Sequence, residues 1–184
     1  MNLPIVQYGH PALRSKGKPI DKIDDRIRKL ADDMIDTMND ADGVGLAAQQ
    51  VGLALQICVV DVADAGDHAG TMLIDGQPAD LDDYMPLVLI NPEVEPFGDT
   101  VPATEGCLSF PALQGQIPRP GQARVTAKTL EDETLSFEAD GLLARAIQHE
   151  KDHLEGVLYI DRMLDEDRQQ LAPDLDKLMR QNAM

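Results

Sequence analysis

The segment His149-Glu150-Lys151-Asp152-His153 carries two histidines that lie four residues apart and flank a glutamate. If this segment is helical, residues four apart share one face, and both imidazoles can bind the same metal ion. Glu150 would then lie beside that metal, where a carboxylate can accept and release protons. The chain has 4 His in all, which disfavours the alternative of a surface helix that carries this spacing by chance.

A catalytic divalent metal usually has three protein ligands and one open position, so the two histidines need a partner. One class of peptidases with this motif adds a third histidine six residues after the second. This chain keeps the glycine of that pattern, Gly156, but has Tyr159 where the histidine belongs. Another class uses a later glutamate, and the nearest candidate, Glu166, lies in an acidic stretch typical of a solvated turn. The residues after His153 therefore offer no good third ligand.

A better candidate lies upstream, in Glu105-Gly106-Cys107-Leu108-Ser109. This short polar segment contains one of the 2 cysteines of the chain, and a thiolate is a strong ligand for zinc or iron. The other cysteine, Cys58, lies in an apolar run that predicts a buried strand, so we expect it in the core. From its own surroundings, Cys107 could equally be a plain buried cysteine.

A third segment, Gly43-Val44-Gly45-Leu46-Ala47-Ala48-Gln49-Gln50, has two glycines that allow close approach of the backbone to a ligand. It makes a poor nucleotide loop, because the third glycine of that fingerprint is missing. The three segments together resemble the motifs of the peptide deformylases, G-x-G-L-A-A-x-Q, E-G-C-L-S and Q-H-E-x-D-H-L-x-G. Their order and approximate spacing agree as well. The resemblance extends from about Pro4 to about Asp161.

The resemblance implies that Cys107, His149 and His153 bind a divalent metal, which would be Fe(2+) in the cell. A thiolate with two imidazoles suits zinc as well as iron, and we expect Zn(2+) or Ni(2+) to replace the iron readily. Because a thiolate ligand on iron invites oxidation, the activity should be sensitive to oxygen.

The resemblance further implies a hydrolase that removes the N-formyl group from the N-terminal formylmethionine of newly made proteins and releases formate. Glu150 would take a proton from the attacking water and deliver it to the leaving amine. The side-chain amide of Gln50 and the backbone N–H of Leu108 would stabilise the charge that develops on the formyl oxygen. The expected partners are N-formylmethionyl nascent polypeptides, met near the ribosome.

Specificity should depend on an apolar slot for the methionine side chain. We expect Val44, Gly45 and Leu108 to line the site and Ala146 to close the floor of the pocket. Arg145 could reach the rim of the pocket or form an outward salt bridge, and both alternatives stay open. Many members of the family carry an arginine shortly after E-G-C-L-S, and this chain has Gln114 near that place, which bears on substrate affinity.

The composition is consistent with one catalytic domain over residues 1–184. No apolar run is long enough to span a membrane and the N-terminus lacks a signal pattern, so we expect a cytoplasmic protein, as a monomer, without membrane contact. The net charge of −17 argues against direct nucleic-acid binding. It has two explanations, an adaptation to high salt or an ordinary acidic protein.

The pattern of apolar residues predicts an α+β fold, in which antiparallel strands pack around a central metal-binding helix and a C-terminal helix follows. A stripe of Ile27, Leu30, Met34 and Met38 predicts an amphipathic helix that Asp24 or Asp25 caps. We expect the metal-binding helix to be capped by Asp140 and ended by Gly156. The last helical segment, 165–184, should break near Pro173.

The strands are predicted from short apolar runs between turn residues. Residues 55–62 form one, and 87–91 another that Pro92 closes. Two hairpins follow, one formed by 94–97 with 100–105 and one formed by 123–130 with 134–139. The segment 63–86 is rich in Asp, Gly and Ala, which predicts an exposed acidic loop insertion, and His68 within it should be solvated.

Two other functions compete with the deformylase hypothesis. A zinc peptidase would rest on the two histidines and Gly156, would cleave within peptides and would not need Cys107. A metal-binding but inactive homologue would contact nascent chains or ribosomes. The presence of both Glu150 and Gln50 argues against inactivity, and the acidic charge argues against RNA contact.

Overall fold

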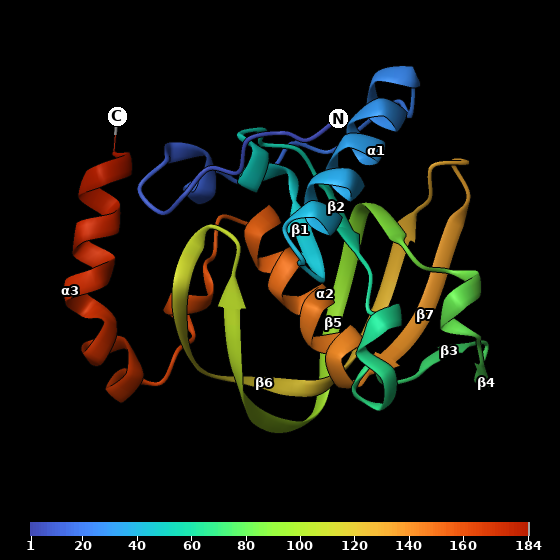
Figure 1. The fold of residues 1–184 in the computed structure, drawn as a ribbon. Coiled ribbons are helices and arrows are strands. Elements are labelled where there is room, and N and C mark those ends of the chain that lie inside the picture. The colour runs from blue at the N-terminus through green and yellow to red at the C-terminus, as the bar shows by residue number, and fades with distance from the viewer. Residues whose placement is uncertain (184) are drawn as a thin grey trace.

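Helix α2 lies at the centre of the molecule, with strands curving around it and the two other long helices on opposite sides (Figure 1). The computed structural model describes residues 1–183, and Met184 lies outside the described residues. The helices and strands are α1 (Asp25–Asp40), β1 (Gly45–Ala47), β2 (Ile57–Val60), β3 (Met72–Ile74), β4 (Gln77–Pro78), β5 (Leu87–Cys107), β6 (Phe110–Lys128), β7 (Thr134–Asp140), α2 (Gly141–Leu154) and α3 (Asp165–Asn182). Short 3-10 helices span Pro11–Arg14, Ala48–Val51, Ala63–His68, Leu81–Asp83 and Tyr159–Asp161. The α+β fold predicted from the sequence is confirmed, with a central helix, antiparallel strands and a C-terminal helix.

The strands form one sheet in the order β1-β2-β5-β6-β7-β3-β4, and every pairing within it is antiparallel. Strands β5 and β6 make a long hairpin that curls beneath α2 and returns beside it (Figure 1). Cys107 pairs with Phe110 at the end of this ladder, so the tip of the hairpin carries Leu108 and Ser109. The hairpin thereby brings the E-G-C-L-S segment to the central helix.

The expected break at Pro92 and the small hairpin of 94–97 with 100–105 are both wrong. Strand β5 runs through all of these residues and pairs with β6 along its length. The pairing register shifts between Ile90 and Glu93 and again between Phe97 and Thr100. Pro92 lies within the first irregularity, where a missing N–H costs no ladder hydrogen bond. Gly98, with φ of 84°, lies within the second, and this bulge looks like a turn in the sequence.

Other predicted elements agree with the structure. Strands β6 and β7 pair from Gln122↔Asp140 to Lys128↔Thr134, as expected for the second hairpin. Helix α1 begins after Asp24, whose side chain accepts hydrogen bonds from two backbone N–H groups of the first turn. Met34 and Met38 are fully buried on the inner face of α1. They pack with Leu46 of β1 in one hydrophobic cluster.

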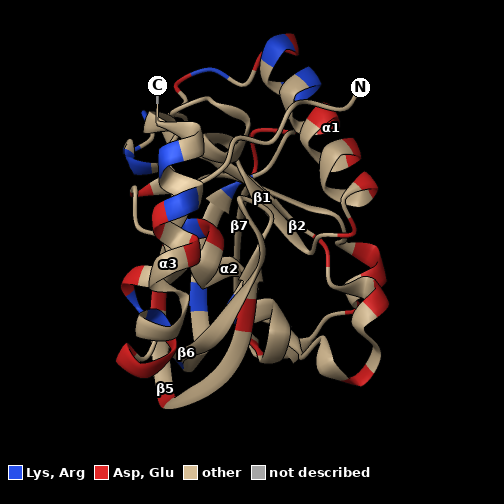
Figure 2. Ribbon diagram, turned by 60° about the vertical axis from the view of Figure 1, so that its left-hand side comes forward, with Lys and Arg blue, Asp and Glu red and all other residues tan. Residues whose placement is uncertain are grey.

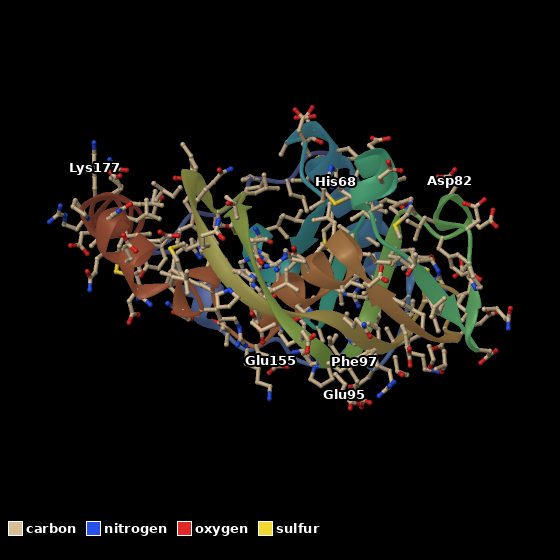
Figure 3. The ribbon with its side chains drawn as sticks, turned by 90° about the horizontal axis from the view of Figure 1, so that it is seen from below. His68, Asp82, Glu95, Phe97, Glu155 and Lys177 are labelled. Atoms are coloured by element: carbon tan, nitrogen blue, oxygen red, sulfur yellow. The ribbon has the colours of Figure 1, made fainter. Side chains whose placement is uncertain are left out.

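Residues 63–86 are not the exposed loop that the sequence predicts. Strand β3 pairs with β7 and so extends the sheet, and Met72 within it is fully buried. Asp140 accepts a 2.6 Å hydrogen bond from the N–H of Thr71 and makes no capping bond to α2, although it precedes the helix. Two buried residues among aspartates and glycines give too little periodicity to reveal a strand three residues long. Ala69 is also buried, the remaining residues of the segment are half-buried or exposed, and Figure 3 shows His68 at the outer surface.

The C-terminal helix α3 continues through Pro173, so the predicted break is wrong. Leu171 precedes the proline and Leu175 and Leu178 follow it, and all three pack against one cluster with Tyr8 and Phe110. This packing on both sides of the proline holds the helix together despite the lost backbone hydrogen bond. Within residues 1–183, no helix combines the length and apolar character needed to cross a membrane.

Candidate active site

Helix α2 presents both histidines and the glutamate to the interior of the protein. His149 is 9% exposed, Glu150 is 4% exposed and His153 is 1% exposed. Leu143 and Ile147 of the same helix are buried in a hydrophobic cluster with residues of the sheet. The helix ends as predicted, with Gly156 in the left-handed region at φ of 77°. The core side of α2 therefore carries the chemistry that the sequence predicts.

Cys107 approaches these histidines from the tip of the β5–β6 hairpin. Its Sγ lies 3.4 Å from Nε2 of His153. One donor atom from each of Cys107, His149 and His153 can be chosen so that all lie within 4.8 Å of one another. Around a tetrahedral zinc, sulfur and nitrogen ligands would be about 3.5 Å apart. The donor set and its spacing therefore fit a divalent metal bound by one thiolate and two imidazoles.

Glu105 orients His149. Its Oε1 lies 2.9 Å from His149 Nδ1, which leaves Nε2 of that ring for a metal. Arg119 donates to both oxygens of Glu105, at 2.7 and 3.1 Å, and Arg145 donates to Oε2 at 2.6 Å. Burial would raise the pKa of Glu105, but the hydrogen bonds from His149 and Arg119 outweigh it and lower the pKa to about 2. Glu105 is thus a fixed anion behind the ring.

The two histidines differ in their electrostatic surroundings. Burial lowers the pKa of His149, but hydrogen bonds with Cys107 and Glu105 outweigh it and raise this pKa well above its usual range. Burial and the neighbouring charge of His149 together lower the pKa of His153 well below its usual range. A neutral imidazole, as at His153, is the form that binds a metal.

Glu150 has the properties of a general base. Burial raises its pKa to about 7. A group that both accepts and releases a proton in catalysis works best when its pKa is close to the surrounding pH. Its Oε1 is buried and makes no hydrogen bond within residues 1–183. Glu150 borders the pocket described below, where its carboxyl group can accept a proton from a reactant.

Gln50 lies next to the thiol. Its Oε1 accepts from the N–H of Ala47 at 3.0 Å, which fixes the amide group. Its Nε2 faces Ser109 Oγ at 3.3 Å and Cys107 Sγ at 3.6 Å. The contact with sulfur is long and weak, so one N–H of Gln50 can turn to an oxygen that enters the site.

A pocket of about 380 Å³ opens in front of these groups. It is bordered by eight of the nine site residues predicted from the sequence, which are Val44, Gly45, Gln50, Cys107, Leu108, Ala146, His149 and Glu150. The ninth, His153, lies deeper and contacts Cys107. The structure therefore brings all nine together.

The structure places Arg145 and Gln114, two residues whose roles the sequence left open. Arg145 borders the pocket, and its charge is held by Glu105 and by the carbonyl oxygens of Ile117 and Val101. Gln114, which lies near the place where the resemblance leads us to expect an arginine, also borders the pocket. Of these two pocket residues, Arg145 has a guanidinium group that is already hydrogen-bonded to protein oxygens, and Gln114 has a neutral amide.

Glu105 and Arg119 are functional residues for which the sequence predicts no role. Arg119 also donates to Asp152 at 2.9 Å, and Asp152 accepts from Arg162 at 2.6 Å. The signal was present, because a histidine that binds a metal usually donates its other N–H to a carboxylate. Glu105 is the acidic residue of the segment that carries Cys107.

Within residues 1–183, none of the other ligand candidates belongs to the ligand group. Glu166 is exposed in the first turn of α3. The hydroxyl of Tyr159 donates to the carbonyl of Leu113 at 2.6 Å. Cys58 is buried in β2 as predicted, and burial raises the pKa of its thiol far above the usual range. Cys107, by contrast, is half-buried and lies in the ligand group.

Comparison with known proteins gives a consistent result. Residues 2–169 match the family model of polypeptide deformylase. A peptide deformylase of Methylacidiphilum infernorum is 45% identical over all of this chain and 96% of its own length. One from Opitutus terrae is 44% identical over 97% of this chain and 93% of its own length.

Solved structures agree. The crystal structure of a peptide deformylase from Synechococcus elongatus in complex with actinonin is 39% identical, with a TM-score of 0.79 over 95% of this chain and 86% of that one. A plant peptide deformylase structure is 38% identical, with a TM-score of 0.82 over 97% of this chain and 90% of that one.

Proposed function

The chain belongs to the polypeptide deformylase family, and we propose that Cys107, His149 and His153 hold the metal on which its reaction depends. The protein is a metal-dependent hydrolase that removes the N-formyl group from the N-terminal formylmethionine of newly made proteins and releases formate. The observation that carries the proposal for the site is the Cys–His–His group beside Glu150 at the base of one pocket.

The proposed metal in the cell is Fe(2+), with Zn(2+) or Ni(2+) able to replace it. One soft thiolate and two imidazoles accept any of these ions. When bound, such a cation supplies a Lewis acid that makes water a better nucleophile near neutral pH. Glu105 supports the ligand set by fixing the ring of His149.

Glu150 is the proposed general base and acid. Its free, buried Oε1 and its pKa of about 7 suit removal of a proton from the attacking water. The same carboxyl group then returns the proton to the amine of the departing methionine. The formyl C–N bond breaks, and formate and a free amino terminus result.

Gln50 and Leu108 are the proposed donors to the developing oxyanion. Gln50 offers the N–H that now faces the sulfur of Cys107. Leu108 follows Cys107 at the tip of the hairpin, and both residues border the pocket. Donors held by a rigid hairpin and a fixed amide need little rearrangement when charge develops.

The peptide is proposed to enter along the segment Gly43–Gly45. Strand β1 is at one end of the sheet, so one of its edges is free to pair with an extended peptide. Val44 is 40% exposed and Ala146 is 5% exposed. They line the proposed slot for the methionine side chain together with Gly45.

We further propose that residues 1–184 form one catalytic domain. This domain would act as a monomer, in the cytoplasm and near the ribosome.

The experiment must distinguish removal of the formyl group from cleavage of a peptide bond in the same substrate. Formate and new amino groups are measured during incubation of the Fe(2+)-loaded protein with formyl-Met-Ala-Ser, without oxygen. The proposal expects one formate per new amino group and an intact Met-Ala-Ser product, and expects Cys107→Ser to lose metal and activity. Free alanine or serine, or full activity of the Cys107 variant, would favour the peptidase. Bound metal without any turnover would favour the inactive homologue.

A further inference from the structure

A second pocket, of about 520 Å³, shares no lining residue with the active-site pocket. It is bordered by residues 83–88, which lead into β5, and by residues 129–135 except Asp132, which include the turn between β6 and β7. Figure 1 shows this turn on the other side of α2 from the tip of the β5–β6 hairpin. The volume of the second pocket lies within the range of pockets that bind ligands.

The second pocket opens where β5 and β6 separate. Strand β5 pairs with β2 from Leu87 onward, whereas its pairing with β6 begins only at Ile90, opposite Lys128. Beyond Lys128 the chain turns into β7, and the N–H of Thr129 donates to the carbonyl of Glu133 at 2.9 Å. Residues 87–89 thus pair with β2 on one edge and with no strand of residues 1–183 on the other. Such an open edge can pair with an extended peptide.

Apolar side chains make up a large part of the lining of the second pocket. Five of them are half-buried and pack against the hydrophobic clusters of the core, namely Tyr84, Met85, Val88, Leu130 and Leu135. An apolar side chain that entered the pocket would leave water and contact these groups, which favours its binding.

The exposed part of the lining carries three carboxylates and no base. Asp83, Glu131 and Glu133 all border the pocket and are exposed. None of them forms an ion pair within residues 1–183. Lys128 is close along the chain, but it does not line the pocket, and its ammonium group contacts the carbonyl of Asp132 at 3.5 Å. The charge of the pocket therefore complements a cationic ligand.

We propose that the second pocket is a docking site for an extended basic segment of a partner protein, in which lysine or arginine residues flank an apolar side chain. The backbone of this segment pairs along residues 87–89, its apolar side chain enters the pocket, and its cations meet the three carboxylates. A free organic cation such as a polyamine would match the carboxylates alone, whereas the open strand edge calls for a polypeptide. The site takes no part in deformylation, so its test is independent of the metal and of the proposed function.

Docking must be distinguished from general attraction, because the net charge of the chain is −17. Figure 2 shows acidic residues on several elements, with α1 and α3 among them. A basic peptide is therefore attracted to much of the surface at low salt. The variant Glu131→Lys/Glu133→Lys reverses two charges at the pocket. The variant Asp174→Lys/Asp176→Lys, with both positions exposed on α3, changes the net charge equally and is the matched control.

The test measures the fluorescence anisotropy of labelled Lys-Arg-Leu-Arg-Lys with wild type and both variants, at about 0.15 M salt. Two further peptides, Lys-Arg-Ser-Arg-Lys and Glu-Glu-Leu-Glu-Glu, test the need for the apolar side chain and for the cations. Hydrogen exchange of the backbone amides, with and without the leucine-containing basic peptide, locates the bound segment on the protein.

Wild type and the α3 variant are expected to bind Lys-Arg-Leu-Arg-Lys with similar affinity, and the pocket variant about tenfold more weakly. The serine and acidic peptides should bind wild type more weakly than the leucine peptide, and exchange should slow at residues 87–89 and 129–135. Equal affinities of the two variants, or of the leucine and serine peptides, would assign binding to overall charge and overturn the docking site. Absence of binding, or slowed exchange only at other residues, would overturn it as well.

Discussion

Position 45 has room for glycine alone. A Cβ there would lie inside the contact distance of Glu150 Oε2 and only 2.9 and 3.0 Å from its Cδ and Cγ. Glu150 belongs to α2 and is buried, so its side chain has little freedom to move away. Because it has no side chain, Gly45 allows the backbone to pass next to the carboxyl group of Glu150.

We predict that Gly45→Ala displaces Glu150 and lowers kcat/KM for deformylation by about 100-fold, the typical cost of a misplacement near 1 Å. Metal content should stay near wild type, because no ligand is touched, whereas the clash with the buried carboxyl group should lower the melting temperature. Gly121→Ala is the control, since a Cβ at that position meets Val101 at an ordinary 3.4 Å. Wild-type activity in Gly45→Ala would show that Glu150 need not hold the position seen in the structure.

For single residues, the sequence predicts the site wherever the reactive side chains belong to one motif. The i, i+4 spacing predicted the two histidines and Glu150, and the resemblance added Cys107 and Gln50. The partners of those residues were missed because they come from distant parts of the chain. Glu105 meets His149 across 44 residues and Arg119 across 14. No local spacing encodes such a contact. The one available signal was general, that a histidine bound to a metal usually donates to a carboxylate, and Glu105 is the carboxylate beside Cys107.

At the scale of elements, the strand β3 is the clearest difference between expectation and structure. Local periodicity predicts α1, α2 and the β6–β7 hairpin, because each has several apolar residues at regular spacing. Strand β3 is three residues long and derives its stability from pairing with β7. Likewise, β5 passes Pro92 and Gly98 because its long partner β6 tolerates bulges at both points. Tertiary pairing overrides local turn signals in these places.

We predict that Met72→Ala lowers the free energy of unfolding by about 2–5 kcal/mol, as expected for truncation of a fully buried side chain. Met179→Ala in α3 is the matched control, because Met179 is 39% exposed and its loss should cost well under 1 kcal/mol. Urea unfolding of both variants makes the comparison. Equal, small losses would mean that residues 63–86 are a dispensable loop after all.

The N-terminal segment is tied to the residues after α2 by an ion pair whose strength depends on pH. Arg14 donates to both oxygens of Asp161, at 2.6 and 3.1 Å. Burial alone would raise the pKa of Asp161, but the hydrogen bonds from Arg14 and from the N–H of Leu158 outweigh it and lower that pKa. The folded pKa thus lies below the unfolded value of about 3.9. The pair stabilises the fold above that value and loses its effect as pH falls through the folded pKa.

We therefore predict that Asp161→Asn lowers the free energy of unfolding by about 1 kcal/mol at pH 7, since the pair is partly exposed. The difference from wild type should shrink below about pH 4. Unfolding by urea at a series of pH values measures it, and Arg14→Gln should show the same dependence. A difference that is constant with pH would mean that packing, and not charge, accounts for the contribution of Asp161.

For the whole molecule, the dominant property is a net charge of −17 on 184 residues. Like charges on a compact surface repel one another, and dissolved salt screens this repulsion. The screening length falls from about 30 Å at 0.01 M to about 3 Å at 1 M salt. The free energy of the folded state should therefore depend on ionic strength more than is usual for a protein of this size.

We predict that the melting temperature rises when NaCl is increased from about 0.01 M to about 1 M. A rise that levels off near 0.2 M is expected for an ordinary acidic protein. A rise that continues to molar salt would support adaptation to a high-salt habitat. No rise at all would show that the acidic surface carries no significant repulsion, and would exclude the high-salt explanation.

The central claim is that Glu150 moves the proton in the removal of the formyl group, next to a metal held by Cys107, His149 and His153. It is tested most directly by formate release from formyl-Met-Ala-Ser without oxygen, comparing wild type with Glu150→Gln after loading both with Fe(2+). We predict release by wild type and a loss of about 10²- to 10⁴-fold in the variant, with equal metal content. Undiminished release by a metal-loaded Glu150→Gln protein would contradict the claim.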